Sequence, residues 1–204
     1  MAGLFVTFEG IDRSGKTTQA RLLCQALGDQ AVAVREPGGT ALGERIRDLL
    51  KDPAAEIGPH AEALLFAAAR AELCRQVIRP ALADGRVVVS DRFLDSSLAY
   101  QGEARGLGVD EVLEVNRWAT EGLLPDLTIY LAIDPAKAAA RAGEADRFED
   151  EGAGLQERVR AAYERLAEAE PRRWVRVEAD RAAEQVHADV LAAVEAARAG
   201  APAG

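Results

Sequence analysis

A short stretch near the N-terminus limits the possible folds of this chain more than any other feature. Residues 10–17 read GIDRSGKT and fit the pattern G-x-x-x-x-G-K-[ST], after the apolar run 4–8 and before a helical pattern. Glycines there let the backbone turn so that N–H groups point inward, and with the next helix N-terminus they form a nest for phosphate oxygens. A chance match has odds of roughly one in a thousand for this composition. The stretch therefore predicts a strand, a phosphate-binding loop and a helix.

The loop predicts a site for a nucleoside triphosphate. Lys16 is expected to bridge the β- and γ-phosphates, and the hydroxyl of Thr17 is expected to ligand Mg²⁺. Lysine occurs only at 16, 51 and 137, so its place in the loop stands out. The less favoured interpretation is a glycine-rich turn that binds nothing. The ATP-binding set predicted from the loop is Gly10, Ile11, Asp12, Arg13, Ser14, Gly15, Lys16, Thr17 and Thr18.

Strand-like and helix-like segments alternate along the chain. Strands are expected at 4–8, 31–36, 86–91, 127–133 and 174–179. Helices are expected at 17–27, 40–51 with a threonine cap, 60–85 with a kink at Pro80, 110–123, after Pro135, 153–170 and 181–199. The strands are continuous apolar runs, which is typical of parallel strands buried on both faces. We predict one α/β domain, 1–204, with the three-layer P-loop NTPase fold: a five-stranded parallel sheet covered by helices on both faces.

Composition excludes several classes of protein. The 204-residue chain carries a formal net charge of −9, which argues against a general nucleic-acid coat, since phosphate contacts need a basic face. No apolar run is long enough for a transmembrane helix, and the first residues lack the features of a signal peptide. Cys24 and Cys74 fall in apolar helical patterns and are expected to be buried, reduced thiols. We therefore expect a cytoplasmic protein without a membrane or nucleic-acid partner.

Ligands of open parallel sheets bind beyond the carboxyl ends of the strands, so the residues there are candidates for a second pocket. Asp91 ends the strand 86–91 and is expected to be the second acid associated with Mg²⁺. Arg92 follows, and its guanidinium suits a phosphate held by two hydrogen bonds, although a surface salt bridge remains the alternative. Polar groups at helical spacing then offer hydrogen bonds to the edge of a base: Ser96, Ser97, Tyr100 and Gln101.

The long helix carries Phe66 and Arg70 on one face, because they are four residues apart. A ring there would stack on a base while the arginine bonds its carbonyl. Helix spacing alone favours the simpler alternative, in which Phe66 belongs to the core and Arg70 to the surface. The loop motif itself leaves three classes open: a small-molecule kinase, a GTPase switch, and a motor or partitioning ATPase. The Asn-Lys-x-Asp sequence expected of a Ras-type GTPase is missing from the chain.

Six stretches together resemble the thymidylate kinase family, whose members phosphorylate dTMP to dTDP. They run in the family's order and span most of the chain: FEGIDRSGKTTQ (8–19), REPGGT (35–40), LLFAAAR (64–70), SDRFLDSSLAYQG (90–102), PDLTIYLAID (125–134) and DRFE (146–149). The resemblance favours the base-binding interpretation of Phe66 and Arg70.

The resemblance implies a role for each residue of a dTMP pocket. Phe66 would stack on thymine and Arg70 would bond a thymine carbonyl, with Ser97 and Gln101 near the base edge. Tyr100 would pack under the deoxyribose, where its bulk disfavours a 2′-hydroxyl. Asp12 would approach the acceptor's sugar and phosphate. The set also contains Arg47 and Arg92, which would grip the acceptor phosphate, and Glu36, whose bond to Pro37 is expected to be cis.

Phosphoryl transfer needs positive charge on the migrating group, and members of this family supply it from the phosphate loop or from a mobile lid. Here Arg13 is assigned to the donor γ-phosphate. Residues 141–152 are predicted to form a short lid, with Arg141 and Arg147 in or beside it, although an ordinary exposed loop is the alternative. Arg147 would assist on closure. The predicted catalytic set is Arg13, Lys16, Arg92 and Arg147.

The resemblance thus implies direct, in-line transfer of the ATP γ-phosphate to dTMP, with Mg²⁺, in the synthesis of dTTP. It also implies a homodimer, for which the alanine-rich helix 60–83 offers a pairing surface. Two alternatives remain. One is another nucleoside monophosphate kinase, with UMP, CMP or AMP as acceptor. The other is an ATP-dependent switch whose output is a binding partner.

Overall fold

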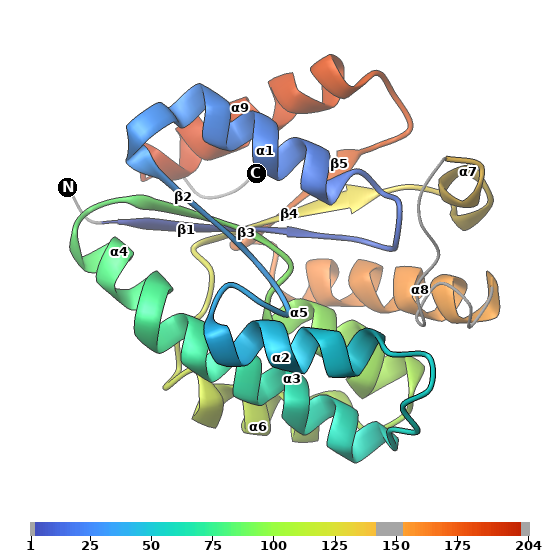
Figure 1. Cartoon of the computed structure of the whole chain (residues 1–204). Helices are drawn as coiled ribbons and strands as arrows, with labels where there is room; N and C mark the ends of the chain where they lie inside the picture. The colour runs from blue at the N-terminus through green and yellow to red at the C-terminus, as the bar shows by residue number, and fades with distance from the viewer. Residues whose placement is uncertain (1–2, 142–152, 201–204) are drawn as a thin grey trace.

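The computed structural model describes residues 3–141 and 153–200. Within these ranges five strands form one parallel sheet in the order β2-β3-β1-β4-β5 (Figure 1). Their bounds are β1 Leu4–Glu9, β2 Ala31–Arg35, β3 Val87–Asp91, β4 Leu127–Ala132 and β5 Trp174–Glu178. The predicted five-stranded parallel sheet is therefore confirmed.

Burial differs between the centre and the edges of the sheet. The central strands β1, β3 and β4 are almost entirely buried, as continuous apolar runs predict. The edge strands β2 and β5 are partly exposed, because each has a neighbour on one side only. The prediction that every strand is buried on both faces was therefore wrong for the two edges.

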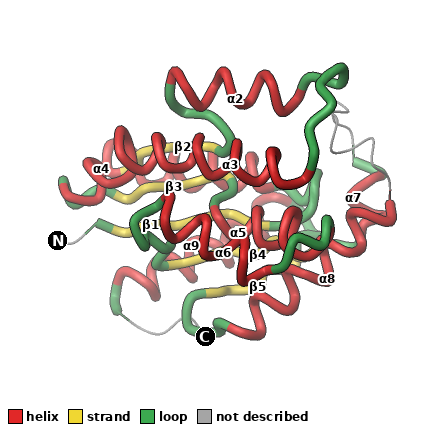
Figure 2. The backbone as a smooth tube through the Cα atoms, turned by 90° about the horizontal axis from the view of Figure 1, so that it is seen from below, coloured by secondary structure: helices red, strands yellow, loops and turns green. Residues whose placement is uncertain are grey.

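Helices cover both faces of the sheet. On one side lie α1 (Lys16–Leu27) and α9 (Ala183–Arg198), which pack on each other and on the strands (Figure 1). The other side holds α3 (Pro59–Leu73), α4 (Arg79–Ala83), α5 (Leu94–Ser97), α6 (Val109–Ala119) and α8 (Ala153–Ala169). The helix α2 (Ala41–Lys51) packs on the outside of α3 (Figure 2), and the short α7 (Pro135–Ala139) follows β4.

Two predicted helices differ in detail. The segment expected as one kinked helix is α3, a π-helical turn Cys74–Ile78, and α4 with Pro80 near its start. A wider turn there accommodates a residue that lacks an N–H and crowds the preceding turn. The helix expected at 110–123 ends at Ala119, because the next turn contains Glu121 at φ 50° and Gly122 at φ 75°, which α-helical backbone excludes. The threonine cap is confirmed, since Thr40 Oγ1 accepts a hydrogen bond from the Gly43 amide.

Residues 94–104 form an element that the strand and helix patterns left unassigned. It consists of α5 and a π-helical segment Leu98–Ala104, and its residues 94–102 are buried. It packs against α6 and α8. This segment carries the polar side chains that were expected to read a base.

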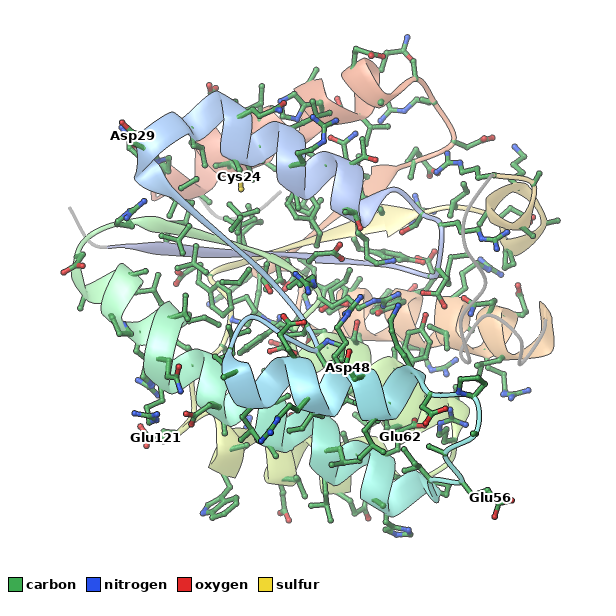
Figure 3. The ribbon with its side chains drawn as sticks, in the orientation of Figure 1. Cys24, Asp29, Asp48, Glu56, Glu62 and Glu121 are labelled. Atoms are coloured by element: carbon green, nitrogen blue, oxygen red, sulfur yellow. The ribbon has the colours of Figure 1, made fainter. Side chains whose placement is uncertain are left out.

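The core divides along the two faces of the sheet. Val6 and Phe8 pack on the α1 side with Leu23, while Phe5 and Val88 pack on the α3 side. Cys24 on α1 is half-buried with its sulfur toward the sheet (Figure 3), and Cys74 is fully buried on the opposite side. Burial raises the pKa of the Cys74 thiol to about 12. Both thiols are free, and the expected burial is confirmed for Cys74 but not for the half-buried Cys24. None of the helices in the described ranges is long and apolar enough to cross a bilayer.

Candidate active site

A cavity of about 340 Å³ lies beyond the carboxyl ends of β1, β2 and β3. The side chains that line it come from the strand ends, α2 and α3, among other segments, and lie between the sheet and these two helices (Figure 3). Five of the predicted donor-side residues line it: Asp12, Arg13, Lys16, Thr17 and Asp91. The other predicted ATP-binding residues are not part of its lining: Gly10, Ile11, Ser14, Gly15 and Thr18. Every residue predicted to contact dTMP also lines it: Asp12, Glu36, Arg47, Phe66, Arg70, Arg92, Ser97, Tyr100 and Gln101. The sequence therefore identified a set of residues that the fold brings to one cavity.

The phosphate loop has the backbone geometry that its glycines allow. Gly10 has φ 145°, and a Cβ atom there would lie 2.8 Å from the carbonyl oxygen of Leu131, so a side chain is excluded. Gly15 has φ 104° and precedes the first residue of α1. Thr18 is exposed in the first turn of that helix. The loop thus ends at the N-terminus of α1, which is where a phosphate nest has its backbone N–H donors.

Lys16 is buried and its ammonium group crosses the loop. Its Nζ donates hydrogen bonds to the carbonyl oxygens of Gly10 (3.1 Å) and Ile11 (2.7 Å) and to Ser14 Oγ (3.4 Å). Burial, and secondarily the nearby cation of Arg92, lower the pKa of Lys16 to about 8. A phosphate at the loop would add negative charge and favour the protonated amine.

Thr17 and Asp91 meet at the tip of β3. The Thr17 hydroxyl donates to Asp91 Oδ2 over 2.5 Å, although 74 residues separate them. A hydroxyl and a carboxylate beside a phosphate nest are oxygen ligands of the kind that Mg²⁺ uses, because this ion is normally held by one or two protein oxygens together with substrate phosphates and water. The described residues contain no cluster of three or more His, Cys, Asp or Glu that would hold a metal by itself. The donor set therefore fits a cation that is bound together with a phosphorylated ligand.

Arg92 is the centre of a second group of polar contacts. It has φ 72°, a left-handed conformation that turns its side chain into the cavity. Its guanidinium forms an ion pair with Asp12 and donates to Ser96 Oγ over 3.0 Å. It also lies over the ring of Tyr100, 5.2 Å from the centroid. Burial alone would raise the pKa of Asp12, but the positive charges of Arg92 and Lys16 outweigh burial and lower it.

Glu9 and Tyr163 belong to this group and were missed by the sequence analysis. Glu9 ends β1, is fully buried, and accepts hydrogen bonds from the Phe93 amide (2.8 Å), Ser96 Oγ (2.6 Å) and Tyr163 OH (2.9 Å). Burial, and secondarily the charge of Asp95, raise the pKa of Glu9 to about 7. A carboxylate at a strand end was the signal that identified Asp91, and it would have identified Glu9 as well. Nothing in the helical pattern of α8 marks Tyr163.

Arg70 is buried rather than at the surface, contrary to what helix spacing alone favours. Its Nε donates to Glu36 Oε2 over 2.7 Å, and its Nη1 donates to Ser97 Oγ over 3.2 Å. The same Nη1 bonds Asn116 Oδ1, and Nη2 donates to the Phe93 carbonyl over 3.1 Å. Each guanidinium nitrogen thus has a protein acceptor, so a base carbonyl at Arg70 would have to share one of these hydrogen bonds.

Glu36 has one oxygen paired with Arg70, while the other, Oε1, is buried and has no hydrogen-bond partner among the residues that the structure describes. Burial raises the pKa of Glu36, and Arg70 offsets part of that increase. The Glu36-Pro37 peptide bond is cis, as predicted. Arg47 on α2 donates to the Pro37 carbonyl over 2.9 Å, which holds its side chain at the cavity. An unpartnered buried oxygen at the cavity is an acceptor available to a ligand that carries a donor.

Tyr100 and Gln101 come from the π-helical segment. Tyr100 OH donates to Asp12 Oδ2 over 3.1 Å, and burial raises the pKa of its phenol. The amide nitrogen of Gln101 donates to Glu62 Oε1 on α3 over 2.9 Å. Phe66 is half-buried on the same helix as Glu62 and lines the cavity with the two residues of the π segment.

Two arginines connect the phosphate loop to the start of the predicted lid. Arg13, at φ 60°, donates to the carbonyls of Ala139 and Arg141, both at 3.3 Å. Arg141 donates to the carbonyls of Arg13 and Ser14, both at 3.1 Å, and to the Ala179 carbonyl at 2.5 Å. Arg141 therefore joins the loop to the end of β5. Arg147 and lid residues 142–152 lie outside the described residues.

Gln156 is another residue that the sequence analysis missed. Its side-chain nitrogen donates to Asp12 Oδ2 over 2.8 Å, and its oxygen accepts from the Asp12 amide over 3.2 Å. The start of α8 is thereby joined to the phosphate loop by a reciprocal pair of hydrogen bonds.

Comparison with known proteins gives one consistent result. A sequence model described as thymidylate kinase matches residues 8–190. The thymidylate kinase of Pelotomaculum thermopropionicum is 50% identical, over 96% of this chain and 94% of that protein. The thymidylate kinase of Leifsonia xyli subsp. xyli is 51% identical, over 92% of each. A crystal structure of thymidylate kinase from Ehrlichia chaffeensis superposes with a TM-score of 0.78 at 32% identity, covering 95% of this chain and 99% of that one.

Proposed function

The chain belongs to the thymidylate kinase family, and we propose that its cavity holds ATP and dTMP end to end while the γ-phosphate passes between them. The protein phosphorylates dTMP, and its fold is that of the P-loop NTPases. The observation that carries the finer proposal is the single cavity in which the phosphate loop, Arg92 and the polar side chains of α3 and α5 converge.

On the donor side, the amides of the phosphate loop and Lys16 bind the β- and γ-phosphates of ATP. The Lys16 ammonium exchanges its contacts with the Gly10 and Ile11 carbonyls for phosphate oxygens. Thr17, with Asp91 behind it, holds Mg²⁺. The ion, when bound, neutralises charge on the phosphates and fixes their orientation. Arg13 lies at the loop surface, and from there it stabilises the charge that develops on the migrating phosphoryl group.

On the acceptor side, Arg92 and Arg47 bind the 5′-phosphate of dTMP. Arg92 exchanges part of its ion pair with Asp12 for the phosphate, and Asp12 then faces the acceptor's sugar and phosphate. An oxygen of this phosphate attacks the γ-phosphorus in line, the bond to the ADP oxygen breaks, and ADP leaves. The acceptor phosphate is already ionised, so no strong general base and no covalent enzyme intermediate are needed.

The base lies between α3 and α5. Phe66 stacks on thymine, Arg70 shares one of its hydrogen bonds with a thymine carbonyl, and Tyr100 packs under the deoxyribose. Ser97 and Gln101 lie at the base edge, and Glu36 lines the same end of the pocket.

Arg147, in the predicted lid, adds positive charge at the migrating phosphoryl group when the lid closes.

A homodimer that pairs through α3 and α6 is part of the proposal. On α3, Ala61, Leu64 and Ala68 are exposed at helical spacing, with Leu64 57% exposed. Trp118 on the neighbouring α6 is 86% exposed. An apolar face of this kind is typical of an interface. We expect Leu64→Glu to convert a dimer to a monomer in light scattering while its melting curve stays cooperative. A wild-type monomer at micromolar concentration would refute this dimer.

A cytoplasmic location is proposed because both cysteines are free thiols.

The test of the proposed function is an acceptor panel. Purified protein is mixed with ATP, Mg²⁺ and one of dTMP, dUMP, UMP, CMP, AMP or GMP, and ADP is followed. We expect rapid ADP release with dTMP, slower release with dUMP and background with the others. Equal turnover of UMP or CMP would retain a kinase and contradict the base contacts. ATP hydrolysis that is indifferent to every acceptor would favour the nucleotide-dependent switch.

A further inference from the structure

Glu62 is a buried acid next to the cavity that the proposed mechanism does not use. It lies in the first turn of α3 and is 1% exposed (labelled in Figure 3). Arg105, which follows the π-helical segment, donates to it twice, from Nε to Oε1 over 2.6 Å and from Nη2 to Oε2 over 3.1 Å. Gln101 donates its amide nitrogen to the same Oε1 over 2.9 Å. An arginine, a buried acid and a buried amide that lines the pocket therefore form one chain of contacts.

This chain determines which way the Gln101 amide is turned. An amide has a donor end and an acceptor end that are nearly equal in shape, so its orientation follows from its partners. A carboxylate paired with an arginine offers only acceptor oxygens, and the nitrogen of Gln101 must therefore face Glu62. The amide oxygen is left on the other side of the group, and Gln101 lines the cavity beside Phe66 and Arg70.

We propose that Glu62, held by Arg105, is a positioning residue that turns the Gln101 oxygen toward the base and selects a pyrimidine with a hydrogen at N3. This inference rests on the proposed function. Thymine and uracil carry an N3–H donor that the amide oxygen accepts. Cytosine has a lone pair at N3, which would meet the oxygen acceptor to acceptor, and a buried unpaired acceptor is costly. The methyl group of thymine is not read by this contact.

The experiment compares dTMP, dUMP and dCMP as acceptors for wild type and Glu62→Gln. A glutamine at 62 can either accept from Gln101 or donate to it, so both orientations of the Gln101 amide become accessible. We expect the ratio of kcat/KM for dTMP over dCMP to fall about tenfold. The ratio for dTMP over dUMP is expected to stay unchanged, because both bases carry N3–H.

Glu72→Gln is the matched control, since Glu72 lies on the same helix but pairs with Arg75 and Gln76 away from the cavity. Its dTMP over dCMP ratio should equal that of wild type. If Glu62→Gln does not fold, the pair Arg105→Lys and Arg105→Met carries the test. The lysine keeps a cation at Glu62 and should preserve discrimination, whereas the methionine loosens Glu62 and should reduce it.

Three results would overturn the inference. The first is a folded Glu62→Gln enzyme whose dTMP over dCMP ratio matches wild type. The second is an equal loss of activity on all three acceptors, which indicates a structural role only. The third is the same change of ratio in Glu72→Gln. A wild-type protein without dTMP-dependent ADP release would refute the proposed function, and this inference with it, before any variant is needed.

Discussion

The two ends of the cavity are built in different ways. At the phosphate-loop end, Lys16 and its contacts come from one run of eight residues, and the lysine bonds mainly to backbone carbonyls. At the base end, Arg70 is held by Glu36, Ser97 and Asn116, which follow or belong to different elements of the fold. A local motif specifies the first end. Only the completed fold specifies the second.

Arg92 lies between the two ends and contacts both. It bonds the Gly10 carbonyl of the phosphate loop over 3.3 Å and pairs with Asp12, while it also bonds Ser96 and packs on Tyr100 from the base side. Its neighbours hold the pKa of the guanidinium well above the ordinary value despite its burial. In the proposed mechanism, the charge that binds the acceptor phosphate is therefore positioned before any ligand binds, which would reduce reorganisation during the reaction.

The largest expected effect is at the loop end. Lys16→Met should lower kcat/KM for ATP about a thousandfold, because the cation on the transferring phosphate is lost. The binding of dTMP alone, measured by calorimetry, should be nearly unchanged, because Arg92, Arg70 and Phe66 are untouched. A parallel loss of dTMP binding would show that the two ends are not separately built.

The next effect is at the residue between the ends. Arg92→Met should lower kcat/KM for dTMP about a hundredfold, since a buried cation for the acceptor phosphate is removed. Arg86→Met is the matched control. Arg86 stands at the other end of β3 and bonds the backbone carbonyls of Asp29 and Ala31, both at 2.9 Å. Steady-state kinetics of both variants should therefore differ sharply, and equal losses would indicate damage to the strand instead of the site.

The contrast between the two ends also explains what the sequence could predict. The loop motif and the strand end predicted Lys16, Thr17 and Asp91 as neighbours at one site, and all three line the cavity, where Thr17 bonds Asp91. Their contacts with phosphate and Mg²⁺ stay predictions. The five strands were predictable because buried parallel strands read as continuous apolar runs. The burial of the edge strands β2 and β5 was overestimated, since it depends on which strands are their neighbours, and sequence alone does not give this.

The base end was predicted only through the family resemblance. Helix spacing by itself favoured a surface Arg70, because the pattern cannot show that Glu36 and Asn116 arrive from distant segments to pair with it. Glu62 and Tyr163 gave no signal for the same reason. Their partners, Gln101 and Glu9, lie 39 and 154 residues away in the chain.

A substitution of Arg13 tests whether the loop end affects kcat without affecting the binding of dTMP. Arg13→Met should lower kcat about thirtyfold, less than loss of Lys16, because in the proposed mechanism Arg147 also contributes positive charge to the migrating group. The dissociation constant of dTMP should change by less than about twofold. Arg21→Met is the control, since Arg21 is exposed on α1 and donates to Gln25 Oε1 of the same helix over 3.2 Å. Near-normal turnover of Arg13→Met would contradict the assignment of Arg13 to the γ-phosphate.

The smallest expected effect is a difference between the two ends in how KM depends on pH. Lys16 has a pKa of about 8, below its ordinary value because of burial, so it is mostly protonated at pH 7 and mostly neutral at pH 9. Rising pH therefore removes the cation from the free enzyme, and the KM for ATP should rise about tenfold between pH 7 and pH 9. Bound triphosphate raises the pKa of the amine, so kcat at saturating ATP should change little. The KM for dTMP should change by less than about threefold, because Arg92 and Arg47 remain charged throughout this range and Glu9, with its pKa of about 7, is already about half ionised at pH 7. Equal changes in both KM values would mean that one titration controls the whole cavity, and the division into two independently built ends would fail.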